Sequence, residues 1–146
     1  MAYLRIFFFV GFIVLSSLYG RCDSQEHRIQ ALWQQCERAR SLSAYQRLDT
    51  LSLRFLRQLG SHHDSRMQAY ASYYRATALV FTGRGREALP LMDRAWNLSQ
   101  QAANDSVGAL VMNIRGIYQA MYQNNSFLAQ HYFFKSLALA RSSHYE

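Results

Sequence analysis

A helical hairpin pattern returns along this chain at a fixed spacing, and this recurrence limits the fold more than any other feature. A glycine-containing turn at Gly83–Gly85 leads into a helical run with Ala88 and Met92 on one face. Ala129 and Phe133 repeat that face after a second turn, and the step from Ala88 to Ala129 is 129 − 88 = 41. A period of this size is the signature of an α-solenoid, in which each hairpin buries its apolar face against its neighbours.

Three Asp-Ser pairs keep the same step, and each stands just before an apolar helical run. Their side-chain oxygens can accept hydrogen bonds from the free amides of a helix N-terminus, and Leu59-Gly60 is a helix stop. The pairs are Asp23-Ser24, Asp64-Ser65 and Asp105-Ser106. We therefore expect an all-α, right-handed α-solenoid of three antiparallel helical hairpins, at about residues 23–63, 64–104 and 105–146.

The composition agrees with a folded helical chain and adds a basic charge. Half of the 146 residues are hydrophobic and there is one proline, which excludes a disordered chain and favours helices. From Asp23 onward, 14 basic residues (16 in the chain less Arg5 and Arg21) oppose 9 acidic ones. Nearly all of them are arginines, which can bind an acidic partner or form the solvated outer faces of amphipathic helices.

Residues 1–22 have the pattern of an export leader. Arg5 precedes an apolar core, and the uncharged segment at residues 6–20 has 15 residues, which is shorter than the roughly 20 that cross a bilayer as a helix. A signal peptide or an uncleaved anchor fits this pattern, and we expect an exported protein, either periplasmic or membrane-tethered. Cys22 ends a segment that resembles a bacterial lipobox except at Arg21, so cleavage, lipidation and retention stay open.

Two stretches resemble the second helix of tetratricopeptide repeats. They are Gly-x-x-x-Glu-Ala-Leu-x-x-Met-x-x-Ala at Gly83–Ala95 and Ser-x-x-Ala-x-x-x-Phe-x-x-Ser-Leu-x-Leu-Ala at Ser126–Ala140. Arg75-Ala76 and Arg115-Gly116 fall where the first helix of such a repeat has its small contact residue. The resemblance covers about residues 25–140, with a period of 41 in place of the usual 34.

Two positions depart from this family pattern. Gly116 is one residue out of phase with Ala76, and Arg47 stands where the small residue equivalent to Ala88 should align. The first hairpin therefore reads as a divergent cap of the array.

The resemblance implies a mode of binding. In the family, the first helix of each hairpin lines a concave face on which a protein or peptide docks. The resemblance thus favours an exported, non-catalytic protein- or peptide-binding scaffold. An export leader followed by such repeats also resembles the input region of membrane-bound sensor kinases and transcriptional regulators of Gram-negative bacteria, so an extracytoplasmic sensor module is the alternative. Nucleic-acid binding through the arginines is a third hypothesis, against which export argues.

The aromatic side of the first helices is the expected binding surface. Tyr70 and Thr77 recur at the same step as Val111 and Tyr118. Tyrosine, tryptophan and arginine together have the composition of a binding hot spot. Packing between helices is the alternative role, above all for Tyr73 and Tyr118. The expected groove residues are Trp33, Tyr70, Tyr73, Tyr74, Thr77, Arg115, Tyr118 and Tyr122.

No constellation in the sequence predicts catalysis, a metal site or a cofactor. The Gly60–Ser65 segment contains the residue types of a serine triad, but neighbours on one loop rarely have triad geometry. His62-His63 lacks further ligands at metal-binding spacing, and Cys22 and Cys36 could pair in an oxidising compartment. We therefore expect no enzymatic activity.

The last hairpin is expected to leave an apolar patch. Tyr132, Phe133 and Leu137 belong to the final helical run, and no further capping helix follows them in the sequence. Such a patch usually marks an interface, so we expect either that the array is truncated there or that the chain self-associates.

Overall fold

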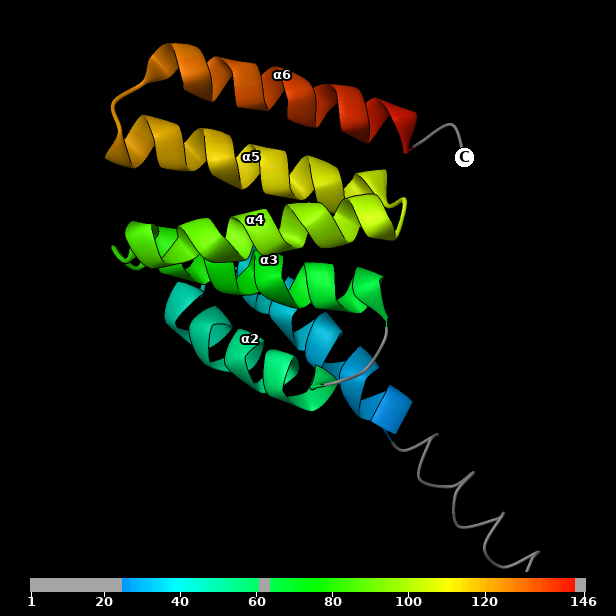
Figure 1. Cartoon of the computed structure of the whole chain (residues 1–146). Coiled ribbons are helices and arrows are strands. Elements are labelled where there is room, and N and C mark those ends of the chain that lie inside the picture. Colours follow the sequence, from blue (N-terminus) through cyan, green and yellow to red (C-terminus); the bar gives the residue numbers. More distant parts are fainter. Residues whose placement is uncertain (1–24, 61–63, 144–146) are drawn as a thin grey trace, which may run out of the picture.

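The computed structural model describes residues 25–60 and 64–143, and all regular structure within them is helical (Figure 1). A first helix covers residues 25–41. It is followed by α2 (Tyr45–Leu59), α3 (Ser65–Phe81), α4 (Gly85–Gln101), α5 (Asp105–Tyr122) and α6 (Ser126–Ser142). Because residues 25–60 and 64–143 contain no strand, the prediction of an all-α chain is confirmed. The leader at residues 1–22 and the pair His62-His63 lie outside the described residues.

The helices form hairpins that stack in chain order. Three-residue turns join the first helix to α2, α3 to α4 and α5 to α6. α3 packs against α2, α4 and α5, and α5 packs against α4 and α6. In Figure 1, α6 therefore lies at one end of the stack, and α2 and the first helix lie at the other. The architecture is repeat-like, since each hairpin is covered by its neighbours in the chain.

Backbone geometry at the turns explains where three of the helices end. Ser43, Gly83 and Ala103 have φ values of 54°, 84° and 46°, which lie in the left-handed region. After each of them, the next amide donates a hydrogen bond to the carbonyl five residues earlier. A left-handed residue with this bond ends a helix and satisfies one of its last carbonyls.

Side-chain caps begin α3, α5 and α6. The side chains of Asp64, Asn104 and Asn125 each accept a hydrogen bond from the amide three residues later, at 3.0–3.1 Å. The Asp64 cap and the Gly60 stop were both predicted from the sequence, and α2 does end at Leu59.

From α3 to the start of α5, the structural repeat has a shorter period than the 41 residues expected from the sequence. The step from the cap Asp64 to the cap Asn104 is 104 − 64 = 40, which corrects the expected step of 41. With the shorter step, Gly116 is in phase with Ala76 and both are buried. α5 has 18 residues and α3 has 17, and this extra residue restores the longer step between the starts of α4 and α6, 126 − 85 = 41.

The same shorter step explains why Arg47 departs from the family pattern. Leu48 stands one such step before Ala88 (88 − 48 = 40), and both residues are 0% exposed. Arg47 is exposed beside it. The second helix of the first hairpin thus buries the position expected from the other hairpins, with a larger side chain.

α3 lies at the centre of the core, and burial falls toward α6. Ten of the 17 residues of α3 are buried, among them four alanines that let neighbouring helices approach closely. They are Ala69, Ala71, Ala76 and Ala78. α6, of the same length, has one buried residue, Ala129. Large side chains of α6 are consequently left at the surface.

Candidate functional site

The eight predicted groove residues do not share one exposed surface. Tyr73, Tyr74, Thr77 and Tyr118 are buried, with 4%, 0%, 3% and 3% of their surfaces exposed. α3 is enclosed by the first helix, α2, α4 and α5, so its tyrosines fill spaces between helices. Tyr74, expected at the edge of a groove, is instead the largest wholly buried side chain of the described residues.

Tyr122 is a packing residue at the other end of these helices. Its hydroxyl donates to the Val80 carbonyl at 2.6 Å, and its ring stacks on that of Tyr118 with 5.3 Å between centroids. A Cβ added to Gly85 would lie 2.7 Å from the Tyr122 ring, so the glycine leaves room for it. The hydroxyl and the ring of Tyr122 are therefore both used within the fold.

Arg115 faces the second helices. Its Nη2 lies 2.6 Å from Oδ1 of Asp93 on α4, and its guanidinium lies over the ring of Tyr132 on α6, 6.0 Å from the centroid. A small hollow of about 140 Å³ opens beside it, lined partly by Leu89 and Tyr118. Arg115 thus serves the junction of α4, α5 and α6, away from the tyrosines of α3.

Trp33 and Tyr70 are the predicted residues that the structure brings together at the surface. Both are partly exposed, and their rings meet edge to face with 6.0 Å between centroids. Glu37 and Arg40 follow Trp33 by four and seven residues on the same side of the first helix, and their side chains pair at 2.8 Å. We call Trp33, Glu37, Arg40 and Tyr70 the aromatic surface.

The charges of the aromatic surface act on its tyrosines. Burial, and then the nearby Glu37 carboxylate, raise the pKa of Tyr70. The same two causes raise the pKa of Tyr74 beneath it, whose ring lies 6.1 Å from that of Tyr70. Both phenols therefore stay protonated at neutral pH and can donate hydrogen bonds. Glu37 and Arg40 were not among the predicted groove residues, although their spacing from Trp33 was a usable signal.

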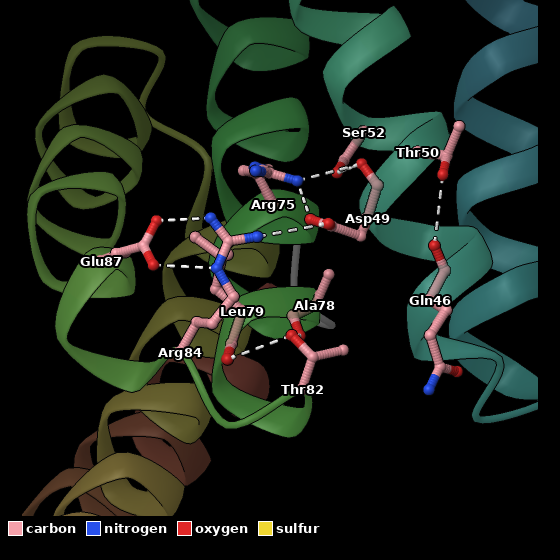
Figure 2. Close-up of polar contacts among 10 residues, drawn as sticks. All are labelled: Gln46, Asp49, Thr50, Ser52, Arg75, Ala78, Leu79, Thr82, Arg84 and Glu87. Carbon is pink, nitrogen blue, oxygen red and sulfur yellow. Dashed lines mark hydrogen bonds and ion pairs between the residues drawn. The ribbon is translucent and has the colours of Figure 1, made fainter.

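A second cluster of charges joins the first two hairpins (Figure 2). The Asp49 carboxylate on α2 forms an ion pair with Arg75 on α3, and the same guanidinium donates a hydrogen bond to the Asp49 backbone carbonyl at 3.2 Å. Arg84, at the start of α4, lies 3.6 Å from the other Asp49 oxygen and also binds Glu87. Figure 2 shows both arginines converging on Asp49 from one side.

This cluster has the character of a structural clamp. Burial, and then repulsion from Arg84, lower the pKa of Arg75, while the hydrogen bond from Arg84 lowers the pKa of Glu87. Arg115, the repeat equivalent of Arg75 (115 − 75 = 40), also pairs with the preceding second helix, at Asp93, which lies about one turn beyond the position equivalent to Asp49 (49 + 40 = 89). Each arginine joins a first helix to the preceding second helix.

The described residues offer few groups for reaction chemistry. Within residues 25–60 and 64–143, no group of three or more His, Cys, Asp or Glu side chains could hold a metal ion. Cys36 is buried as a free thiol, and burial raises its pKa to about 12. No helix among the same residues has the length and apolar character to cross a membrane.

No protein-family model matches this chain, and neither a curated protein nor a solved structure matches it.

Proposed function

We propose that this chain is a non-catalytic helical repeat scaffold that binds a protein or peptide on the aromatic surface. In this proposal the hairpins form a right-handed solenoid of the tetratricopeptide type, and the protein is exported, in the periplasm or tethered to a membrane. The buried pattern that recurs from hairpin to hairpin supports the repeat. The export leader of the sequence supports the location.

The observation that carries the proposal is the contact of Trp33 with Tyr70 beside the Glu37–Arg40 pair. Large aromatic side chains with a polar tip, partly exposed and next to charges, have the composition of a hot spot. Tyr74 and Tyr73 support them from below, because the Tyr73 and Tyr74 rings lie 5.3 Å apart in the core. A supported surface needs little reordering when a partner binds.

An unused donor lies beneath this surface. The indole N–H of Trp33 is buried and has no hydrogen-bond partner among the described residues. A buried donor without an acceptor costs free energy, so a movement of the Trp33 ring that brings this N–H to a backbone carbonyl of a bound peptide is favourable. The Glu37 carboxylate and the Arg40 guanidinium supply one charge of each sign for orienting the ligand.

Peptide selection on the full chain tests the proposal. We would enrich binders from a displayed random peptide library and measure their Kd for the full chain and for Tyr70→Ala. Loss of a hot-spot tyrosine should weaken binding about tenfold or more. Leu89→Ser, a change of an exposed apolar residue on α4, should leave the Kd unchanged.

A folding control separates binding from stability. Tyr74→Ala empties a fully buried site on the same helix and should lower the melting temperature far more than Tyr70→Ala does. If no peptide is enriched, or if Tyr70→Ala binds as tightly as the unaltered chain, the aromatic surface is not the binding site.

A further inference from the structure

The outer face of α6 carries a stripe of large apolar side chains. Phe127, Phe134 and Leu137 are 83%, 71% and 47% exposed. Phe133, at the edge of the stripe, is 38% exposed, and its ring also lies against α5, where a Cβ added to Gly116 would be 2.5 Å from it. Their spacings of seven and three residues place Phe127, Phe134 and Leu137 on one side of the helix. Arg141, which is exposed, follows Leu137 by four residues and continues the line. We call these five residues the α6 stripe.

α4 uses two of the equivalent positions for packing. Met92 and Trp96 are the repeat equivalents of Phe133 and Leu137 (133 − 92 = 137 − 96 = 41), and Met92 is 1% exposed. The Trp96 ring lies against α5, where a Cβ added to Gly108 would be 3.5 Å from it. Leu137 thus has the register of a side chain on which a following helix packs, whereas Phe127 and Phe134 align with the exposed Arg86 and Asp93 of α4 (127 − 86 = 134 − 93 = 41) and are apolar at α6 alone.

The charges of α6 indicate which helix fits. α6 contains no acidic residue, and its basic side chains are Lys135 and Arg141. Lys135 lies over the Trp96 ring, 4.6 Å from its centroid, which leaves Arg141 as the charge on the stripe. The α6 helix of a second copy would bring no carboxylate to Arg141, whereas an acidic helix from another protein would.

We propose that the α6 stripe binds an amphipathic helix of another protein, with apolar residues against Phe133, Phe134 and Leu137 and an acidic residue opposite Arg141. Anchors at spacings of three, four and seven residues are typical of a helix laid on a helical surface. This surface is separate from the aromatic surface, because α6 lies at the opposite end of the stack from the first helix (Figure 1). Binding at either surface can therefore be tested, and lost, independently of binding at the other.

Two synthetic amphipathic helical peptides test the proposal with the full chain. They share one apolar face, and the polar face carries glutamates in one and lysines in the other. By fluorescence anisotropy, the glutamate peptide should bind about tenfold tighter than the lysine peptide. Arg141→Glu should abolish that preference.

The matched control uses two apolar side chains of equal exposure. Phe134 and Leu42 are both 71% exposed, but Leu42 lies in the turn after the first helix. Phe134→Ser should raise the Kd of the glutamate peptide about tenfold, whereas Leu42→Ser should leave it unchanged. Both variants should have the melting temperature of the unaltered chain. Equal effects of the two variants, or no binding of either peptide, would overturn the proposal. Light scattering that shows a dimer dissociated by Phe134→Ser would also overturn it, by making a second copy the occupant.

Discussion

Tyr122 shows how a tyrosine, a residue type that is common in binding sites, can instead pack within the fold. Its ring fills the space above Gly85, and its hydroxyl donates to the Val80 carbonyl. It therefore ties the end of α5 to the turn between α3 and α4. A tyrosine pattern in sequence does not separate the two uses, since the polar tip can bind a ligand or a carbonyl of the fold.

Changes at this contact should alter stability and leave binding unaltered. Tyr122→Phe removes one hydrogen bond and should lower the free energy of unfolding by about 1 kcal/mol in urea titrations. Gly85→Ala forces the ring away and should cost about 1–3 kcal/mol. If Tyr122→Phe left the stability unchanged and raised the peptide Kd about tenfold, Tyr122 would instead belong to the binding surface.

Cys36 makes the stability of the fold vary with pH in the alkaline range. Burial raises the pKa of its thiol from 9.0 to about 12, so the folded chain keeps a proton that the unfolded chain releases. Because the unfolded state binds fewer protons, this stabilisation is present below pH 9 and is lost as the pH rises from 9 toward about 12.

A comparison of variants isolates this effect from the tyrosines. In a Cys22→Ser background, we expect Cys36→Ala to lower the free energy of unfolding at pH of about 8, and this loss to shrink by pH of about 10.5. Chemical denaturation at several pH values measures the difference, from which the tyrosines cancel except for Tyr74, whose pKa is raised mainly by burial and in part by Cys36. A difference that is constant across this range would show that the folded thiol titrates normally.

At the scale of elements, the ion pair between Asp49 and Arg75 joins α2 to α3. The side chains are 25% and 11% exposed, so removal of one partner leaves a charge that water reaches poorly. Arg75→Met should lower the free energy of unfolding by about 2 kcal/mol. Arg47→Met is the matched control, since Arg47 is exposed on α2, and it should change stability by less than about 0.5 kcal/mol.

The double variant completes the cycle. Asp49→Leu added to Arg75→Met removes the carboxylate, whose remaining partner is Arg84 at 3.6 Å, and should recover part of the lost stability. If the two changes are additive, the pair does not hold the hairpins together, and its geometry is incidental.

The helices and their ends could be predicted from the sequence, whereas the register could not. Turn residues such as Gly60 and caps such as Asp64 act locally, so their signals lie in adjacent residues. The extra residue within α5 leaves its apolar pattern helical and has no local signal. Asp105, aligned by its type with Asp64, is the first residue of α5, and Asn104 is the cap.

At the scale of the whole molecule, burial depends on how many neighbours a helix has. α3 is covered on several sides by other helices, and α6 packs mainly against α5. The groove prediction placed Trp33 and Tyr70 at a surface, as the structure does, but it also placed Tyr74 there. Enclosure of α3 depends on the packing angles of its neighbours, which periodicity does not encode. Among the described residues, the fully exposed aromatics therefore lie on α6, whereas Trp33 and Tyr70 of the aromatic surface are partly exposed.

The two tryptophans of the chain allow the most direct test of the central claim, that the aromatic surface binds a peptide. Trp33 belongs to this surface, whereas Trp96 lies on α4 beneath Lys135. Their indole N–H groups give two separate NMR signals, which Trp33→Phe would assign. On addition of a selected peptide, the Trp33 signal should shift and the Trp96 signal should stay. A shift of the Trp96 signal with an unmoved Trp33 signal would contradict the account.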